Sequence, residues 1–251
     1  MESSMSCGQM IKFSMSKIIM EMIGTAFLTL FFISGYETTI LLGLWILTIF
    51  FWKITGSHFN PAVTFALMFR KDDRKISVKL GIAYICAQLL GGYLGALLAN
   101  FYTYNLVVLD FNNWFRAVLQ ELLVSFFFVF FFQISTDEKL LFSNEKAINC
   151  FIIASSYIGA RAIFAGNGTV ATNYGAVANP AIALGICLAG LFGNGIKSFE
   201  AIYLYPTLPF AGAFLAVLFY ELIYKKTQKV FSNVDDDGSD DLGNSSGGEH
   251  D

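Results

Sequence analysis

The chain has 251 residues, of which 55% are hydrophobic and only 14% are charged, and its mean hydropathy is +0.59. This composition, with 27 phenylalanines and a net charge of −3, excludes a soluble domain of ordinary make-up. We therefore expect an integral membrane protein.

The predicted elements of the first half begin after a polar segment, residues 1–16, which has no clear secretory cleavage site and is expected in the cytoplasm. Three segments are long and apolar enough to span a bilayer, and the second is the shortest. They are Ile18–Ser34, Thr38–Trp52 and Leu80–Tyr102. The tripeptide Asn60-Pro61-Ala62 lies between the second and the third.

The second half repeats this order. Its predicted spans are Ala117–Ile134, Ala147–Ala165 and Ala201–Tyr224, and Asn179-Pro180-Ala181 lies between the last two. Residues 232–251 are almost entirely Asp, Gly, Ser and Asn, a composition that buries too little apolar surface to fold. We expect them to form a disordered acidic cytoplasmic tail, after a membrane domain that covers residues 17–231.

Each Asn-Pro-Ala tripeptide predicts the start of a helix, because Asn caps free amides and Pro at the first helical position loses no hydrogen bond. The apolar runs that follow, Val63–Phe69 and Ile182–Phe192, are too short to span roughly 30 Å at about 1.5 Å per residue. They are expected to be half-helices. A broken backbone at membrane depth is tolerated only inside protein or along a water-filled path, so the two breaks indicate a path.

Cationic residues outside the spans gather on one side, which the positive-inside bias makes cytoplasmic. They are Lys12, Lys17, Lys53, Arg70, Lys71, Arg74, Lys75, Lys79, Lys139, Lys146, Lys225, Lys226 and Lys229. Both termini are then cytoplasmic, and the two tripeptide loops enter from opposite faces. This places the second half upside down relative to the first, with a site near the midplane.

Glu21 and Glu121 each stand near the start of their half's first span, followed by small and then bulky apolar residues. A carboxylate inside a membrane is costly and needs partners. We expect the two side chains to accept hydrogen bonds from the loop amides behind the Asn-Pro-Ala motifs; the alternative is a merely interfacial position. Small residues recur in the third and sixth spans, at 87–96 and 208–213, where they permit close helix crossing.

The stretch from Thr55 to Thr64, together with the glutamates and the second Asn-Pro-Ala, closely resembles the aquaporin (major intrinsic protein) family over residues 17–224. The resemblance implies an all-α membrane protein: six transmembrane helices plus two re-entrant half-helices in an inverted repeat, assembled as a homotetramer. Asn60 and Asn179 would each present an amide donor to a single file of water. Acceptors would be the carbonyls of residues 56–58 and 175–177.

The chain departs from the family pattern after the second motif, where the usual filter arginine is replaced by Ile182. Spacing puts the other filter positions near Asn167 on the fifth helix and Ala176 in the loop, with Ile40 or Leu42 on the second helix. Arg161 is an isolated cation in the fifth span. It could substitute for the missing filter charge; the alternatives are snorkelling to the outer surface or pairing with an acid.

His58, two residues before the first motif, is expected to brace the loop, or alternatively to tune access with pH. Cys7, Cys86, Cys150 and Cys187 show no paired spacing, so we expect no disulfide, metal or other cofactor. No set of residues for an enzyme is recognisable in a chain with only two histidines.

These features predict a passive channel for water that excludes protons and ions. Because the filter position is apolar, small neutral solutes such as glycerol, urea or ammonia are expected to pass as well. No nucleic-acid partner is expected. The alternatives are a non-conducting structural protein of the same fold, an aquaglyceroporin-type pore with little water selectivity, and an inverted-repeat transporter, for which only Glu21, Glu121 and Arg161 could supply a midplane site.

Overall fold

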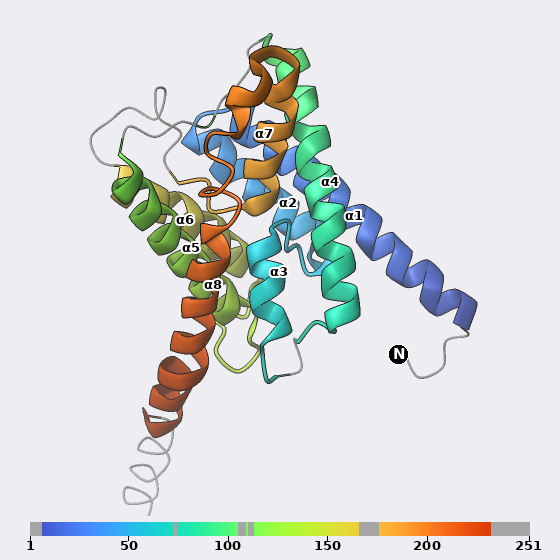
Figure 1. Cartoon of the computed structure of the whole chain (residues 1–251). Helices are drawn as coiled ribbons and strands as arrows, with labels where there is room; N and C mark the ends of the chain where they lie inside the picture. Colours follow the sequence, from blue (N-terminus) through green and yellow to red (C-terminus); the bar gives the residue numbers. More distant parts are fainter. Residues whose placement is uncertain (1–6, 73–74, 105–108, 110–112, 166–175, 232–251) are drawn as a thin grey trace, which may run out of the picture.

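The computed structural model describes residues 7–72, 75–104, 109, 113–165 and 176–231, and every regular element in these ranges is helical (Figure 1). The predicted all-α fold is confirmed. In chain order the elements are α1 (Cys7–Ser34), α2 (Glu37–Thr55), α3 (Pro61–Met68), α4 (Val78–Thr103), α5 (Trp114–Thr136), α6 (Lys146–Ala165), α7 (Pro180–Asn194), the 3₁₀ turn η2 (Gly195–Phe199), α8 (Leu208–Phe219) and the π-helical turn η3 (Tyr220–Tyr224).

The helix α3 is short and begins inside the protein. The chain leaves α2 at Gly56, whose φ of 88° and N–H bond to the Trp52 carbonyl end that helix in a left-handed turn. Asn60 then caps α3, with Pro61 at its start. At eight residues and about 1.5 Å per residue, α3 covers only about 12 Å. It is the half-helix predicted at residues 63–69.

The helix α7 is the second half-helix and is longer than the predicted run from 182 to 192. It has 15 residues, about 22 Å at 1.5 Å per residue, and η2 extends it by one turn. It also begins inside the protein, at the buried cap residue Asn179. It therefore runs from the interior to one face only.

The six helices predicted as spans are present, and the bounds of one need correction. The predicted span 147–165 is the helix α6, which Asn149, Ser155, Ser156 and Arg161 make more polar than its neighbours. By length and composition alone, six helical segments are apolar enough to cross a membrane, and Pro180–Phe199, the half-helix α7 with η2, is counted among them in place of α6. The last span begins at Leu208, not Ala201, because Pro206 disfavours a helical conformation in the residue before it, whereas Pro209 lies in the first turn of α8, where a proline is tolerated. The span continues to Phe231.

Glycines let helices approach closely, both within each half and between the two halves. In the first half, a Cβ on Gly91 would lie 2.2 Å from the Met22 carbonyl oxygen of α1; in the second, one on Gly212 would lie 2.5 Å from the Leu122 carbonyl oxygen of α5. Gly92 of α4 faces α7 in the same way, 2.1 Å from the Ala181 carbonyl oxygen. The small residues predicted to allow close crossing are therefore at helix crossings.

Each half-helix packs against helices of the other half. The second half's α7 packs against α4 and α1, and the first half's α3 packs against α8 and α5 as well as against α4 of its own half. In Figure 1, α3 and α7 lie one above the other in the centre of the bundle. The start of α1 and the end of α8 lie on the same side of the molecule as α3, so the chain enters and leaves the bundle on one face.

Candidate pore centre

The two Asn-Pro-Ala motifs meet in the interior through a reciprocal pair of hydrogen bonds. Asn60 Nδ2 donates to the Ala178 carbonyl at 2.8 Å, and Asn179 Nδ2 donates to the Phe59 carbonyl at 2.9 Å. Each Oδ1 caps its own helix, accepting the amide of Ala62 at 2.8 Å or of Ala181 at 3.0 Å. The N-termini of α3 and α7 thus face each other, joined by two residues 119 positions apart in the sequence.

The Glu21 carboxylate holds the first loop. Oε1 accepts the His58 amide at 3.0 Å, and Oε2 accepts the Phe59 amide and Gln88 Nε2, both at 2.8 Å. The Glu121 carboxylate holds the second loop, accepting the Val177 amide at 2.5 Å and the Ala178 amide at 2.8 Å. Both side chains are fully buried, and both accept hydrogen bonds from the loop amides behind the Asn-Pro-Ala motifs.

Left-handed backbone at equivalent positions makes this double contact possible. Phe59 and Ala178, each just before its Asn, have φ values of 48° and 49°, and Ser57 has 54°. Such conformations are uncommon and costly in residues other than glycine. At Phe59 and Ala178 the N–H points to a glutamate while the carbonyl accepts the opposite Asn. The strain is thus used to fix the meeting point of the two motifs.

His58 belongs to a polar cluster that only the first loop has. Its Nδ1 lies 3.1 Å from Thr64 Oγ1, and Gln88 Nε2 lies 2.9 Å from the same hydroxyl. The ring also packs edge-on against Tyr84, with centroids 5.3 Å apart. These contacts support the bracing interpretation of His58. In the second loop, Val177 and Ala183 occupy the positions that correspond to His58 and Thr64.

Arg161 pairs with an acid that the sequence did not reveal. Its Nη2 lies 2.8 Å from Glu37 Oε1, its guanidinium lies 4.7 Å from the Phe32 ring, and its Nη1 donates to the Ala176 carbonyl. The side chain is only 3% exposed, so it does not snorkel. Arg161 thus contacts Ala176, the loop residue at which spacing predicted one of the filter positions.

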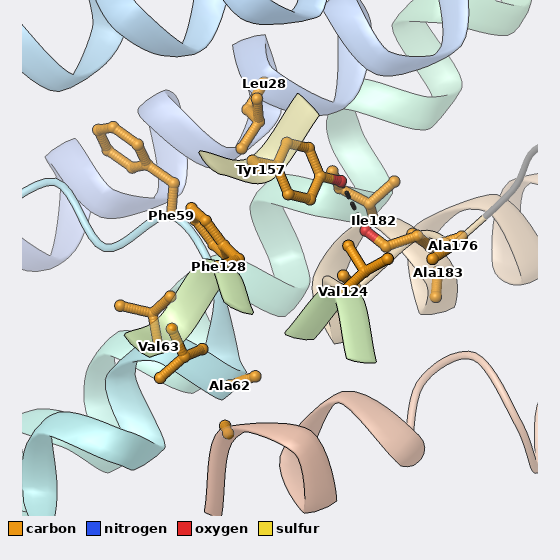
Figure 2. Packing of buried hydrophobic residues seen from close by; sticks show 14 of the residues in the cluster. Leu28, Phe59, Ala62, Val63, Val124, Phe128, Tyr157, Ala176, Ile182 and Ala183 are labelled. Atoms are coloured by element: carbon orange, nitrogen blue, oxygen red, sulfur yellow. Dashed lines mark hydrogen bonds between the residues drawn. The ribbon is translucent and has the colours of Figure 1, made fainter. Parts of the chain in front are cut away.

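Tyr157, one turn before Arg161 on α6, hydrogen-bonds to the carbonyl of the next residue in the same loop. Its hydroxyl donates to the Val177 carbonyl at 2.6 Å. Figure 2 shows the Tyr157 ring reaching toward Ile182 and Ala176. Two side chains of α6 therefore take two of the carbonyls that were expected to serve as acceptors for water.

The remaining predicted filter residues lie in different surroundings. Ile182 is completely buried and Ile40 is 2% exposed, whereas Leu42 is 50% exposed. Of the two alternatives on α2, Ile40 thus lies in the interior. Asn167 and Gly175 lie outside the described residues.

A cavity of about 580 Å³ lies on the α3 side of the first loop. It is lined by Gly56 and His58 of that loop, by Tyr84, and by Lys17, Lys53 and Lys75, among others. Among the described residues, none donates a hydrogen bond to the carbonyls of Gly56, Ser57 or His58. The cavity thus lies beside loop residues whose carbonyls were predicted to serve as acceptors.

Sequence reasoning missed Glu37, Tyr157 and Gln88. Glu37 immediately precedes the predicted span Thr38–Trp52, and the other two resemble ordinary helical residues. One signal was present: an intramembrane arginine requires an acid, and Glu37 is the acidic residue that flanks the short second span.

Comparison with known proteins shows to which family this chain belongs. Residues 35–220 match the family model described as Major intrinsic protein. The chain belongs to the major intrinsic protein family. Aquaporin-4 of Rattus norvegicus is 32% identical to it over 185 residues, which are 69% of this chain and 51% of the relative. Probable aquaporin PIP2-6 of Oryza sativa subsp. japonica is 29% identical over 182 residues, 68% of this chain and 61% of the relative.

A solved structure has the same fold. The aquaglyceroporin from Plasmodium falciparum superposes with a TM-score of 0.70 at 18% identity, over 86% of this chain and 99% of that one. The matched region spans about half to three fifths of the length of the curated relatives. The aquaporin-like bundle predicted from the sequence is thereby confirmed.

Proposed function

We propose that this protein is a passive transmembrane channel for water that also admits small uncharged solutes such as glycerol, urea or ammonia. The observation that carries the proposal is the meeting of α3 and α7 through Asn60 and Asn179. Each helix N-terminus carries about half a positive charge. Two such ends at one point repel cations and protons while neutral molecules pass.

The Asn side chains have one donor to spare. A side-chain amide has two N–H groups, and one of them is used in the bond to the opposite loop. The second would orient a passing water so that its neighbours cannot relay a proton across the junction. Glu21 and Glu121 hold the loops by their amides, which directs carbonyls toward the path.

Solute selectivity is proposed to depend on Arg161 in place of the family's filter arginine. Its guanidinium contacts the Ala176 carbonyl beside buried Ile182 and supplies the donors that Ile182 lacks. Because Glu37 pairs with it at 2.8 Å, the outer mouth carries almost no net charge. Such a mouth favours neutral solutes without strict selectivity for water.

A non-conducting structural protein is the second candidate, favoured by one observation. Tyr157 and Arg161 occupy the carbonyls of Val177 and Ala176, which would otherwise accept bonds from a file of water. If these side chains do not yield, the outer half of the path is closed.

The deciding measurement is stopped-flow light scattering of proteoliposomes. Shrinkage is followed in an impermeant osmolyte and then in glycerol and urea gradients, with Asn60→Asp plus Asn179→Asp as control. Fast shrinkage alone indicates a water channel, and fast shrinkage followed by re-swelling indicates a broad pore. Shrinkage no faster than in empty vesicles would reject the channel in favour of the structural role.

Two variants test the filter. Arg161→Ala should change the ratio of glycerol to water permeability, and Ile182→Arg combined with it should restore strict selectivity. If Arg161→Ala leaves the ratio unchanged, Arg161 is no filter residue. The matched control is Lys197→Ala, which removes a cation from η2.

We further propose a homotetramer in a bilayer, with both termini cytoplasmic. Large apolar side chains on the outer surface of the bundle, such as Phe50, Phe101 and Phe192, are 75%, 75% and 77% exposed and would contact lipid or neighbouring subunits. Chemical cross-linking in native membranes would give the subunit number, and proteolysis of sealed vesicles would give the side of the tail.

A further inference from the structure

A series of aromatic rings connects the two loops along α5 and α6. At one end, the Tyr157 hydroxyl donates to the Val177 carbonyl of the second loop at 2.6 Å. The centroid of the Tyr157 ring lies 5.0 Å from that of Phe128, which lies 6.2 Å from that of Phe132. Phe132 in turn packs against His58 of the first loop, with ring centroids 6.1 Å apart. Phe128 is therefore the middle ring between the two loops.

The depth of Phe128 in the bundle follows from its neighbours. Phe132 and His58 line the 580 Å³ cavity on the α3 side, and Phe128 lies one turn of α5, about 6 Å, further in. Beyond it, Tyr157 reaches the second loop. Because the two loops meet through the paired Asn side chains of the motifs, Phe128 lies at the depth of this junction.

Leu28 of α1 is the counterpart of Phe128 in the inverted repeat. Each stands seven residues, nearly two turns, after the glutamate that holds a loop, and so lies on the same face of its helix as that glutamate. Leu28 is 3% exposed and Phe128 is 4% exposed, and both belong to the buried cluster shown in Figure 2. The second half thus places a ring where the first half has an aliphatic side chain.

The packing of the helices indicates where a path would pass the junction. The helices α4 and α8 pack against the half-helices, whereas α2 and α6 pack against each other and against α1 and α5. A file of molecules passing the ends of α3 and α7 would therefore run between these ends and a wall formed by α2 and α6. Tyr157 is on α6, and Phe128 contacts it from α5.

We propose that Phe128 forms the narrowest point of the path and limits the passage of uncharged solutes larger than water. The inference rests on the proposed channel function. A phenyl ring offers no strong hydrogen-bonding group, so a passing molecule finds its partners only on the side of the motifs. Glycerol or urea would have to turn polar groups toward the ring without partners, which costs free energy. Arg161 then selects by charge at the outer mouth, and Phe128 selects by size at the junction.

Tyr157 is the residue that positions the Phe128 ring. The two ring planes are inclined by 55°, and Phe132 packs edge-on against Phe128 at 76°; such aromatic pairs are favourable beyond the area that they bury. The hydroxyl bond to the Val177 carbonyl fixes Tyr157 itself. Tyr157 therefore acts on solutes through Phe128.

The first test measures the ratio of glycerol to water permeability in proteoliposomes, which does not depend on how much of the protein is correctly folded. Phe128→Val should raise this ratio on the order of tenfold, the scale on which small changes in the size of an apolar site discriminate between substrates. Phe128→Leu, which copies Leu28, should raise it less. An unchanged ratio in Phe128→Val while water still flows would overturn the proposal.

The matched control is Phe127→Val. Phe127 is the neighbouring residue on α5 and is 39% exposed, so the same volume is removed from the outer surface. Its ratio should equal that of the full chain. A rise as large as in Phe128→Val would show that a general loosening of α5 is the cause, and would also overturn the proposal.

Tyr157→Phe tests the positioning role, because it removes the hydroxyl and keeps the ring. The ratio should rise about twofold or more, since the lost hydrogen bond releases the ring pair. If Tyr157 acts through Phe128, the same change should add nothing in the Phe128→Val background. An equal further rise in that background would contradict the positioning role.

The closing test does not depend on conduction. The thiol introduced by Phe128→Cys should react with methyl methanethiosulfonate, because a path brings water to it and the thiolate is the reactive form. The thiol introduced by Phe127→Cys faces the apolar surroundings of the bundle and should react slowly; mass spectrometry of the peptides gives both rates.

The combined outcomes separate this proposal from the channel function. Water flow with an unreactive thiol at position 128 would overturn the constriction and keep the channel. Flow in Phe128→Val but not in the full chain would support the narrow point and reject the open channel. No flow in any variant, together with an unreactive thiol, would overturn both.

Discussion

The two loops that meet at the pore centre are held in different ways. The first is held at its amides by Glu21 and by the His58–Thr64–Gln88 cluster, and its residues Gly56 and His58 line a cavity. The second loop is held both at its amides and at its carbonyls. Glu121 takes its amides, and Arg161 and Tyr157 take its carbonyls.

This difference separates what the inverted repeat shares from what each half does alone. The capping Asn, the left-handed residue before it and the buried glutamate occur in both halves. The shared set builds the junction where helix N-termini face each other. The unshared contacts decide how wide and how polar each mouth is, so we expect substitutions in the shared set to affect folding and those in the unshared set to affect selectivity.

The largest expected effect distinguishes the two glutamates. Glu21→Ala leaves three buried donors without an acceptor and Glu121→Ala leaves two. Each orphaned donor costs about 1–3 kcal/mol, partly offset because no carboxylate is buried. We expect a loss of about 3–6 kcal/mol for Glu21→Ala and less for Glu121→Ala, measured by thermal unfolding in detergent. Equal losses would show that the hydrogen bond from Gln88 to Glu21 adds nothing to stability.

The second prediction concerns the crossing that joins the halves. Gly92→Ala places a Cβ 2.1 Å from the Ala181 backbone oxygen, so α4 and α7 must separate. Overpacking of this kind costs about 1–3 kcal/mol. Gly159 on α6 has nothing within 4 Å. Gly159→Ala should therefore be neutral or gain up to about 1 kcal/mol from helix propensity, and it serves as the matched control in the same unfolding measurement.

Of the shared features, the sequence predicted the capping Asn and the glutamate that holds each loop, but not the left-handed residue before each Asn. Each Asn-Pro-Ala combines a capping residue with a proline, and each glutamate is a charge that cannot be left alone in an apolar helix. These are local signals, repeated twice. They were enough for the half-helices and for the contacts of Glu21 and Glu121.

The unshared features were not predictable because they depend on pairing between distant residues. Arg161 and Glu37 are 124 positions apart, and nothing local indicates their contact. Tyr157 has the pattern of an ordinary core residue. The start of the last helix was placed seven residues early because Ala201–Tyr205 is apolar enough for a helix, although Pro206 disfavours a helical conformation in the residue before it.

The third prediction tests the outer mouth. Glu37→Gln removes the carboxylate that pairs with buried Arg161, which should cost about 1–3 kcal/mol through a lost charged hydrogen bond. It also leaves one positive charge beside Ala176, so flux of any cationic solute should fall further. Glu145→Gln, at an exposed position, is the control. Unfolding and vesicle swelling in methylammonium chloride measure the two effects, and an unchanged ratio of cation to water flux would contradict a filter role for the pair.

The smallest effect lies at the opposite mouth and depends on pH. Burial opposes ionisation of Asp72, but the hydrogen bonds and charges of Arg70 and Lys225 outweigh it and lower the pKa of Asp72 from 3.8 to about 2. A depressed pKa contributes stability that is fully present above the unfolded-state value and is lost as pH falls through the folded-state value. The loss should therefore occur between about pH 4 and pH 2. Because the carboxylate is partly exposed, the contribution is discounted to about 1 kcal/mol or less. Unfolding midpoints from pH 6 to pH 2 should fall less steeply in Asp72→Asn, and parallel curves would show that the charge network around Arg70 holds without Asp72.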